Sequence, residues 1–217
     1  SAHSIIPTPD GKGLFLVSGT YTSVPARTTS AQPPVWQEDI LTPSIPDPMG
    51  HAVGLTAPGG WICRISPDGK DWKMIGSGFR NSVDIAVNRE GELFTYDSDM
   101  EFDIGVPWYR PTRINHVTSG SEFGWRSGSG VWLDHFADSL GSVLDVGPGS
   151  PTAISFGHHS NFPAEFQDKL FICDWTFGTI FTVELQEAGS SYTGTKTEFL
   201  HGSPLNIAAM RFGPDGA

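Results

Sequence analysis

The chain has 217 residues, a formal net charge of −11 and a pI of about 4.9. With 13 Lys and Arg against 24 Asp and Glu it cannot neutralise many phosphates, which excludes a protein that binds nucleic-acid backbones. Its 7 Trp and 14 Phe exclude a disordered chain, and no apolar run approaches the roughly 18 residues of a transmembrane segment.

Short runs of β-branched and aromatic residues, bounded by Gly, Pro, Asp or Ser, predict strands along the whole chain. In chain order they are 13–18, 61–65, 73–75, 82–87, 92–96, 113–117, 169–173, 179–185, 197–200 and 206–212. Helical periodicity is almost absent, and 26 Gly with 17 Pro supply many turns. The sequence therefore predicts an all-β fold.

A Pro-Asp-Gly type of turn recurs at 8–11, 66–69 and 213–216, with a related turn at 88–91. Leu-Phe pairs recur at 14–15, 93–94 and 170–171, close to two of these turns. Repeats of this kind are typical of β-propeller blades, whose units run to about 40–50 residues and lengthen with insertions. We expect one domain over 1–217, a partial propeller of about four blades.

Two stretches interrupt the strand pattern, the Pro-rich segment 21–60 and the segment 107–151, and we expect both to be long loop insertions. Both ends of the chain look cut, so we expect a fragment of a longer protein. Cys63 and Cys173 each lie in an apolar run. Buried free thiols are the favoured interpretation, and one disulfide between them is the alternative.

The densest group of charged residues alternates along one short segment. In an extended chain its carboxylates face one way and repel each other unless a cation compensates them, which favours Ca²⁺. Pairing with Arg110 and Arg113, or a solvated acidic edge, are the alternatives. The candidate metal ligands are Asp97, Asp99, Glu101 and Asp103.

Aromatic and basic residues follow this acidic segment at once. Trp108 and Tyr109 can stack on a sugar or a planar cofactor, and Arg110, Arg113 and His116 add donors and a proton carrier. The alternative is an aromatic core in which the arginines balance the acidic run.

Two further pairs stand at strand ends. Arg80 and Asn81 precede a strand, where they can bind a substrate oxygen or cap a turn, and Asp174 and Trp175 end a strand and can point inward.

Several of these motifs carry a family resemblance. The segments 78–81, 84–86, 91–94, 97–103 and 121–125 resemble the glucose/sorbosone dehydrogenase-like family, six-bladed propellers of the pyrroloquinoline quinone (PQQ) sugar dehydrogenase type. The segments 107–113, 124–128, 147–151 and 174–175 are similar to a subgroup of large, exported bacterial proteins that often carry a haem-binding cytochrome c domain elsewhere in the chain.

The resemblance implies an oxidoreductase of sugars or other alcohols. It makes His3 the general base and Arg80, with Asn81 beside it, the assisting pair. It also places Ca²⁺ near 97–101 and PQQ against the cofactor-binding candidates above. Electrons would pass to a cytochrome-type acceptor, with haem only in a separate domain. The expected location is extracytoplasmic, in the periplasm or at the cell surface.

The sequence also departs from the family pattern. The quinone-binding Lys of the family falls on or beside Asp174 and Trp175. The quinone-binding arginines fall near Ala208 and Ala209, with Arg211 close by but displaced. The alternative function is therefore a non-catalytic, calcium-stabilised propeller that binds glycans or protein partners. A lactonase-like hydrolase is a third reading, less favoured because its acidic ligands would come from several blades.

Overall fold

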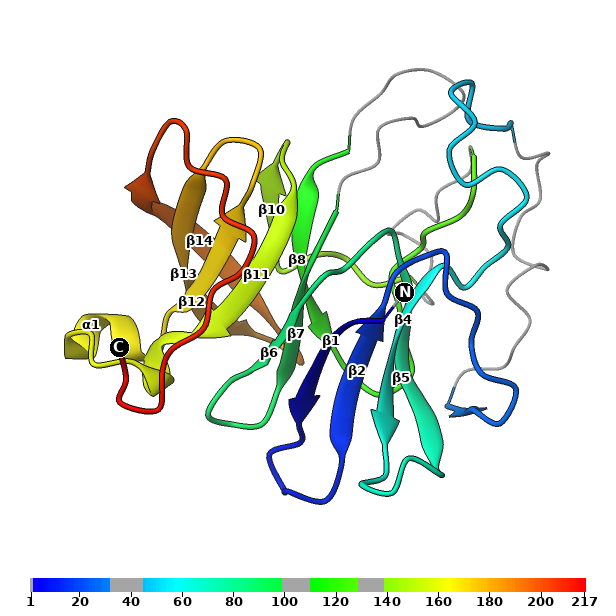
Figure 1. The fold of residues 1–217 in the computed structure, drawn as a ribbon, viewed down its shortest axis with the longest axis horizontal. Helices are drawn as coiled ribbons and strands as arrows, with labels where there is room; N and C mark the ends of the chain where they lie inside the picture. Colours follow the sequence, from blue (N-terminus) through cyan, green and yellow to red (C-terminus); the bar gives the residue numbers. More distant parts are fainter. Residues whose placement is uncertain (1, 32–44, 99–109, 129–138) are drawn as a thin grey trace.

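The computed structural model describes residues 2–31, 45–98, 110–128 and 139–217. Antiparallel sheets of four consecutive strands stand side by side, so that each meets the next face to face (Figure 1). This arrangement confirms an all-β partial propeller. We call the sheets blades 1, 2 and 3 in chain order.

Blade 1 contains β1 (Ala2–Pro7), β2 (Leu14–Ser18), β4 (Gly60–Ile65) and β5 (Trp72–Phe79). Two short strands, β3 (Thr29–Ser30) and β9 (Ser121–Glu122), pair in parallel with β5. Because β9 belongs to the chain between the third and fourth strands of blade 2, it fastens that blade to blade 1.

Blade 2 contains β6 (Ile85–Val87), β7 (Leu93–Asp97), β8 (Thr112–Val117) and β10 (Leu144–Gly147). Blade 3 contains β11 (Pro151–Phe156), β12 (Leu170–Asp174), β13 (Thr179–Ala188) and β14 (Ser191–His201). The short helices η1 (Gly157–His159) and α1 (Ala164–Gln167) connect β11 to β12. No helix in the described ranges is long and apolar enough to cross a membrane.

The blades are held together by apolar cores at the places where they meet. Ile62 of blade 1 packs with Ile85 and Leu93 of blade 2, and Phe94 of blade 2 packs with Ile154 and Leu170 of blade 3. Strand β6 lies against both β1 and β11, so these three are the inner strands of their blades. Burying apolar area between sheets is the main stabilising contribution to such a stack.

The Leu-Phe pairs mark the second strand of each blade, β2, β7 and β12. The repeat is therefore one pair per blade, and long loops inside the blades stretch it well beyond the 40–50 residues expected. For this reason the described residues form three blades where the spacing suggested about four. The segment 206–212, expected as a strand, is not one, because it forms no ladder with a neighbour.

The other predicted strands coincide in position with observed ones, although 82–87 is longer than β6 and 73–75 and 197–200 are shorter than β5 and β14. The structure adds β1, β10 and β11, whose polar, Gly or Pro residues obscure them in the sequence. The segment 107–151 contains β8, β9 and β10, so the part of it between blade strands is shorter than the whole range. Cys63 and Cys173 are buried free thiols, which confirms the favoured interpretation.

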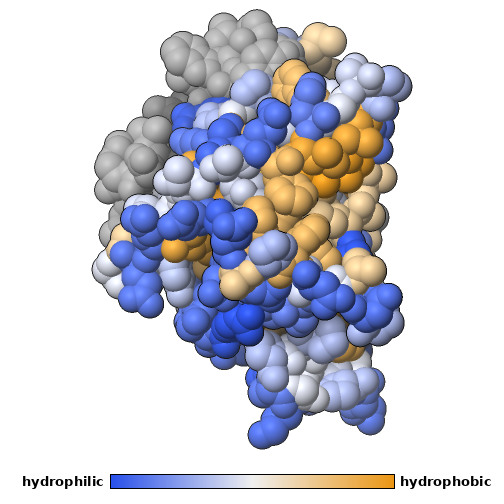
Figure 2. Space-filling model, turned by 90° about the vertical axis from the view of Figure 1, so that its left-hand side faces the viewer, coloured by the Kyte–Doolittle hydropathy of each residue, from blue (hydrophilic) through white to orange (hydrophobic). Residues whose placement is uncertain are grey.

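The outer face of blade 3 carries exposed apolar side chains, and Figure 2 shows the apolar area that looks away from the other blades. Large apolar residues exposed on this blade and its loops are Phe162, Trp175, Phe177, Phe199 and Leu200. Contiguous exposed apolar area of this kind is uncommon on a soluble surface.

Candidate functional site

The segments before the inner strands and the ends of the second strands lie at one edge of the blades, the upper edge in Figure 1. Antiparallel pairing produces this arrangement, since Ala2 lies opposite Ser18 in blade 1 and Pro151 lies opposite Asp174 in blade 3. We call this edge the upper face. It gathers His3, Arg80, Asn81, Asp97 and Asp174 from separate parts of the sequence.

His3, in β1, is oriented by the loop that connects β5 of blade 1 to β6 of blade 2. Its Nδ1 lies 2.8 Å from the carbonyl oxygen of Ser82. Because a carbonyl only accepts hydrogen bonds, Nδ1 carries the proton in neutral His3, and the lone pair is then on Nε2. This tautomer is the one a proton acceptor at Nε2 requires.

Asn81 lies close to the same imidazole, because both side chains approach Gly19, the residue directly after β2. A methyl group added at Gly19 would overlap Oδ1 of Asn81 and would lie 2.6 Å from Cε1 of His3. Only a residue without Cβ allows this approach. The structure therefore brings together His3 and Asn81, two of the three predicted catalytic residues. Arg80, the third, is half-buried next to Asn81 in the chain.

Asp97, the last residue of β7, holds the loop that carries these residues. Its Oδ2 accepts the backbone N–H of Arg80 at 3.0 Å, and its Oδ1 accepts the N–H of Asn81 at 2.9 Å and the hydroxyl of Ser82 at 3.0 Å. The carboxylate is fully buried, and Nη2 of Arg113 lies 3.7 Å from Oδ2. Asp97 is thus a positioning residue for the loop 80–82.

The predicted metal site is described only at Asp97. Both oxygens of that carboxylate already accept hydrogen bonds from the chain, which leaves few lone pairs for a cation. Its predicted partners Asp99, Glu101 and Asp103 lie outside the described residues, so the acidic cluster stays a prediction. Within the ranges that the structure covers, no three His, Cys, Asp or Glu residues gather closely enough to hold a metal ion.

Asp174 repeats this arrangement at the end of β12. Its Oδ1 accepts the backbone N–H groups of Ser150 at 2.6 Å and Thr176 at 3.1 Å, and its Oδ2 accepts that of Phe177 at 3.0 Å. The carboxylate was predicted as a cofactor contact. It is buried, and its hydrogen bonds stabilise the turn that follows β12. Trp175 beside it is half-exposed.

The equivalence of Asp97 and Asp174 could have been found in the sequence. Each stands three residues after the Phe of a Leu-Phe pair. The corresponding position in blade 1 is Ser18, whose buried Oγ has no hydrogen-bond partner in the part of the chain that the structure describes.

The remaining candidates are divided between the two ends of β8. Arg113 lies opposite Asp97 and donates to the carbonyl of Phe123 at 2.7 Å. It therefore lies close to the upper face, where it contacts Asp97 and the segment after β9. His116 lies opposite Phe94, toward the other end of the strand, and its Nε2 lies 2.8 Å from a Glu92 carboxylate oxygen. The structure therefore does not bring His116 together with His3.

Arg110 is half-buried at the start of its described segment. Trp108 and Tyr109 lie outside the described residues.

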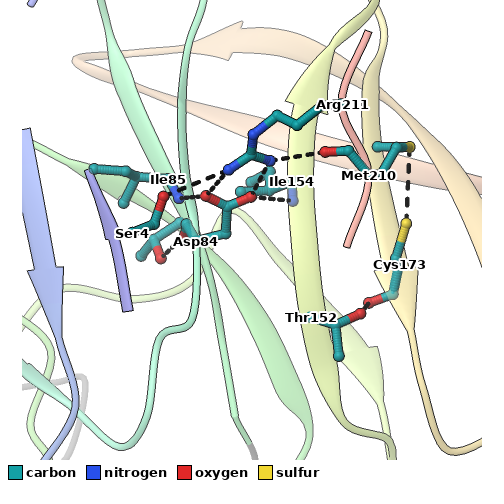
Figure 3. Close-up of polar contacts among 9 residues, drawn as sticks. Ser4, Asp84, Ile85, Thr152, Ile154, Cys173, Met210 and Arg211 are labelled. Atoms are coloured by element: carbon teal, nitrogen blue, oxygen red, sulfur yellow. Dashed lines mark hydrogen bonds and ion pairs between the residues drawn. The ribbon is translucent and has the colours of Figure 1, made fainter. Parts of the chain in front are cut away.

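A third buried carboxylate in this part of the structure is Asp84, directly before β6, which was not singled out as a site by any sequence pattern. Figure 3 shows Arg211 facing it, with Nη1 2.6 Å from Oδ2 and Nη2 2.8 Å from Oδ1. Asp84 also accepts the N–H groups of Ile85 and Ile154. This ion pair raises the pKa of Arg211 and fastens the C-terminal segment across the inner strands.

No family model matches the chain, and no curated protein matches it with significance. Solved structures do. A putative oxidoreductase (glucose dehydrogenase) from Thermus thermophilus matches with a TM-score of 0.65 and 18% identity, over 98% of this chain and 56% of the other. The soluble aldose sugar dehydrogenase of Escherichia coli, in its apo-form, matches with a TM-score of 0.63 and 17% identity, over 98% and 58%.

The PQQ-bound aldose sugar dehydrogenase of Streptomyces coelicolor matches with a TM-score of 0.61 and 15% identity, over 96% of this chain and 52% of the other. The chain thus spans little more than half the length of these three proteins. At such identities the likeness shows the fold alone, and that fold is part of a sugar dehydrogenase-like β-propeller.

Proposed function

We propose that the upper face belongs to a propeller oxidoreductase of sugars or other alcohols, in which Nε2 of His3 accepts the proton of the substrate hydroxyl. The observation that carries this proposal is the contact between Nδ1 of His3 and the Ser82 carbonyl, which selects the required tautomer. Alcohol oxidation needs such a base, because the hydroxyl proton must leave as a hydride passes from carbon to a two-electron acceptor, which a bound redox cofactor or an added acceptor would supply.

The neighbours of His3 suit this role. Asn81 offers an amide next to the imidazole, and Arg80 offers a cation from the same loop for the developing alkoxide. Asp97 fixes the loop through buried hydrogen bonds, so the groups are held before substrate binds. Such preorganisation lowers the cost of reaching the transition state.

The described residues do not fit PQQ. The anionic carboxylates of PQQ need cationic partners. The position expected for a Lys falls on Asp174 and Trp175, and the Asp174 carboxylate already accepts backbone hydrogen bonds from the turn beside it. Arg211, the nearest Arg to the other expected positions, is bound to Asp84. We therefore derive no step through the quinone. Ca²⁺, a cytochrome-type acceptor and an extracytoplasmic location stay parts of the proposal, and the assay below shows whether added PQQ takes part.

The test is to assay the protein with a panel of aldoses and an artificial electron acceptor, with and without added PQQ and Ca²⁺. We expect acceptor reduction in one of these conditions and a loss of roughly 100-fold or more in His3→Gln. His159→Gln, which removes an exposed imidazole at the far end of blade 3, is the matched control and should keep full activity. No acceptor reduction under any combination would overturn the proposal.

A second candidate function, binding without catalysis, is supported by the buried carboxylates of Asp97 and Asp174. Asp97 and Asp174 both stabilise turns, which suits a non-catalytic propeller that binds glycans or protein partners through its loops, with Ca²⁺ as a structural ion. A glycan array with hits, together with no turnover in the assay above, would support this alternative. Turnover without hits would reject it.

A further inference from the structure

A cavity of about 310 Å³ lies at the edge of blade 1 opposite the upper face, and many of the basic residues of this acidic protein line it. Five of the 13 Lys and Arg residues of the chain line it, namely Lys12, Arg27, Arg64, Lys70 and Lys73. They come from the β1–β2 turn, the segment before β3, the end of β4, the β4–β5 turn and the start of β5. We call this cavity the cationic groove.

The strand register forces two of these cations together. Arg64 on β4 lies directly opposite Lys73 on β5, and Lys73 lies beside Thr29 on β3. Side chains that are directly opposite share a face, with Cβ atoms about 5 Å apart, and like charges in that position are destabilising. The fold therefore maintains a repulsion that a bound anion would relieve.

The carboxylates nearby neutralise the groove only in part. Asp10 pairs with Arg64 at 2.7 Å and Asp68 pairs with Lys70 at 3.3 Å, both at exposed positions where such pairs contribute little. Asp71 is the one acidic residue of the lining. Lys12, Arg27 and Lys73 have no carboxylate partner among the residues that the structure describes, and a surplus of two positive charges remains.

One of these cations is held in place without being neutralised. The guanidinium of Arg27 lies 5.3 Å from the centre of the Trp72 ring, and the indole N–H of Trp72 donates to the carbonyl of Gly69 at 3.0 Å. A cation–π contact orients the guanidinium while leaving its charge and most of its N–H donors for a ligand. The guanidinium of Arg27 is thus oriented in advance and can donate hydrogen bonds to an oxyanion with several acceptor oxygens.

We propose that the cationic groove binds the phosphate monoester of a small molecule. A phosphate monoester carries a charge of about −1.5 to −2 at neutral pH and three acceptor oxygens, which matches the surplus charge and the three cations without carboxylate partners. The volume lies near the lower limit of about 300 Å³ for ligand pockets, which suits one small ring with its phosphate. A long polyanion is disfavoured, because the net charge of −11 would repel it outside the groove. This site is separate from the upper face and does not depend on the proposed oxidation.

The test is calorimetric titration of the protein with glucose 6-phosphate, glucose 6-sulfate, inorganic phosphate and glucose. We expect glucose 6-phosphate to bind at least tenfold tighter than glucose 6-sulfate, which has the same shape and one negative charge, and glucose not to bind. Inorganic phosphate binding as tightly as the ester would show that the oxyanion supplies all the recognition, and would support the site.

Variants locate the site. Lys73→Gln and Lys12→Gln should each weaken binding about tenfold, because each removes a charged hydrogen-bond donor. Lys169→Gln, the same charge change on blade 3, should leave binding unchanged. Lys73→Gln should also raise the melting temperature without ligand, since it removes the repulsion with Arg64. Lys12 lies in an exposed turn, so its variant remains informative if Lys73→Gln folds poorly.

Three results would overturn the proposal. They are an absence of phosphate-ester binding to the wild-type protein at millimolar concentration, equal binding of sulfate and phosphate esters, and binding that neither Lys12→Gln nor Lys73→Gln weakens.

Discussion

Asp84 and Arg211 are 127 residues apart in the chain, yet their side chains form a bidentate ion pair, with Nη1 2.6 Å from Oδ2 and Nη2 2.8 Å from Oδ1. Asp84 lies at the start of the inner strand of blade 2 and also accepts the N–H of Ile154 in the inner strand of blade 3. One carboxylate thus connects two blades and the C-terminal segment. The Asp84 side chain is buried and Arg211 is half-exposed.

Arg211→Ala should lower the free energy of unfolding by about 1–2 kcal/mol, because it leaves a buried carboxylate without its cation while solvent screens part of the loss. Urea unfolding measures the change. Arg89→Ala is the matched control, since Arg89 pairs with Asp168 at 2.8 Å with both side chains exposed, and it should cost less than about 0.5 kcal/mol. Equal decreases in the free energy of unfolding in the two variants would contradict the claim that the Asp84–Arg211 pair stabilises the fold more than an exposed ion pair does.

Asp97→Ala should destabilise the protein by about 3 kcal/mol or more, because it leaves two backbone N–H groups and the Ser82 hydroxyl without their acceptor. Asp174→Ala should cost a similar amount for the same reason. The measurement is urea unfolding of both variants. Chelation of divalent cations from the wild-type protein should not reproduce the loss, since the chain itself supplies these hydrogen bonds. A chelator effect as large as that of Asp97→Ala would assign the carboxylate to a metal instead.

Gly19→Ala should displace His3 and Asn81, because the new methyl group would lie 2.6 Å from Cε1 of His3. We expect the imidazole resonances of His3 to shift in NMR spectra and any dehydrogenase activity to fall at least tenfold. Gly141→Ala is the control, as a methyl group there meets no atom within 4 Å. Unchanged His3 resonances in Gly19→Ala would show that the site adapts to the added group.

Burial raises the pKa of Cys63 and of Cys173 to about 12, above the ordinary thiol value of 9.0. The unfolded chain therefore loses thiol protons at a lower pH than the folded protein, and stability should fall as pH rises from 9.0 toward 12. A thiol reagent should modify neither cysteine in the native protein at mildly alkaline pH, and both after unfolding. The double variant Cys63→Ala/Cys173→Ala is the control, and its stability should depend less steeply on pH in this range. Rapid modification of the native protein would contradict the buried positions.

Most of the blade strands and their repetition were predictable, because each depends on residues close together in the sequence; β1, β10 and β11 were not, since polar, Gly or Pro residues obscure them. The runs containing the Leu-Phe pairs predicted β2, β7 and β12 correctly, and similar short runs of β-branched and aromatic residues predicted β4 and β8. The number of blades was predicted less well. Loop length is not encoded by strand patterns, so the same repeats were compatible with shorter units and a further blade.

The candidate site shows the same division. His3, Arg80 and Asn81 could be proposed from their motifs, and Asp97 could be identified as an important acid. That Asp97 holds a loop could not be predicted, because a carboxylate accepts hydrogen bonds from whichever donors the fold places around it, and these donors come from the end of another blade.

The sequence by itself determined the fold class, the turns and the residues able to perform proton transfer, since local conformational preference and side-chain chemistry are properties of short segments. Only the tertiary structure decided which charges meet. It paired Asp84 with Arg211, separated His116 from His3, and turned five scattered cations of an acidic chain into one groove. The physical reason is that electrostatic and hydrogen-bond energies depend on distances of a few ångströms, and packing of the blades sets those distances.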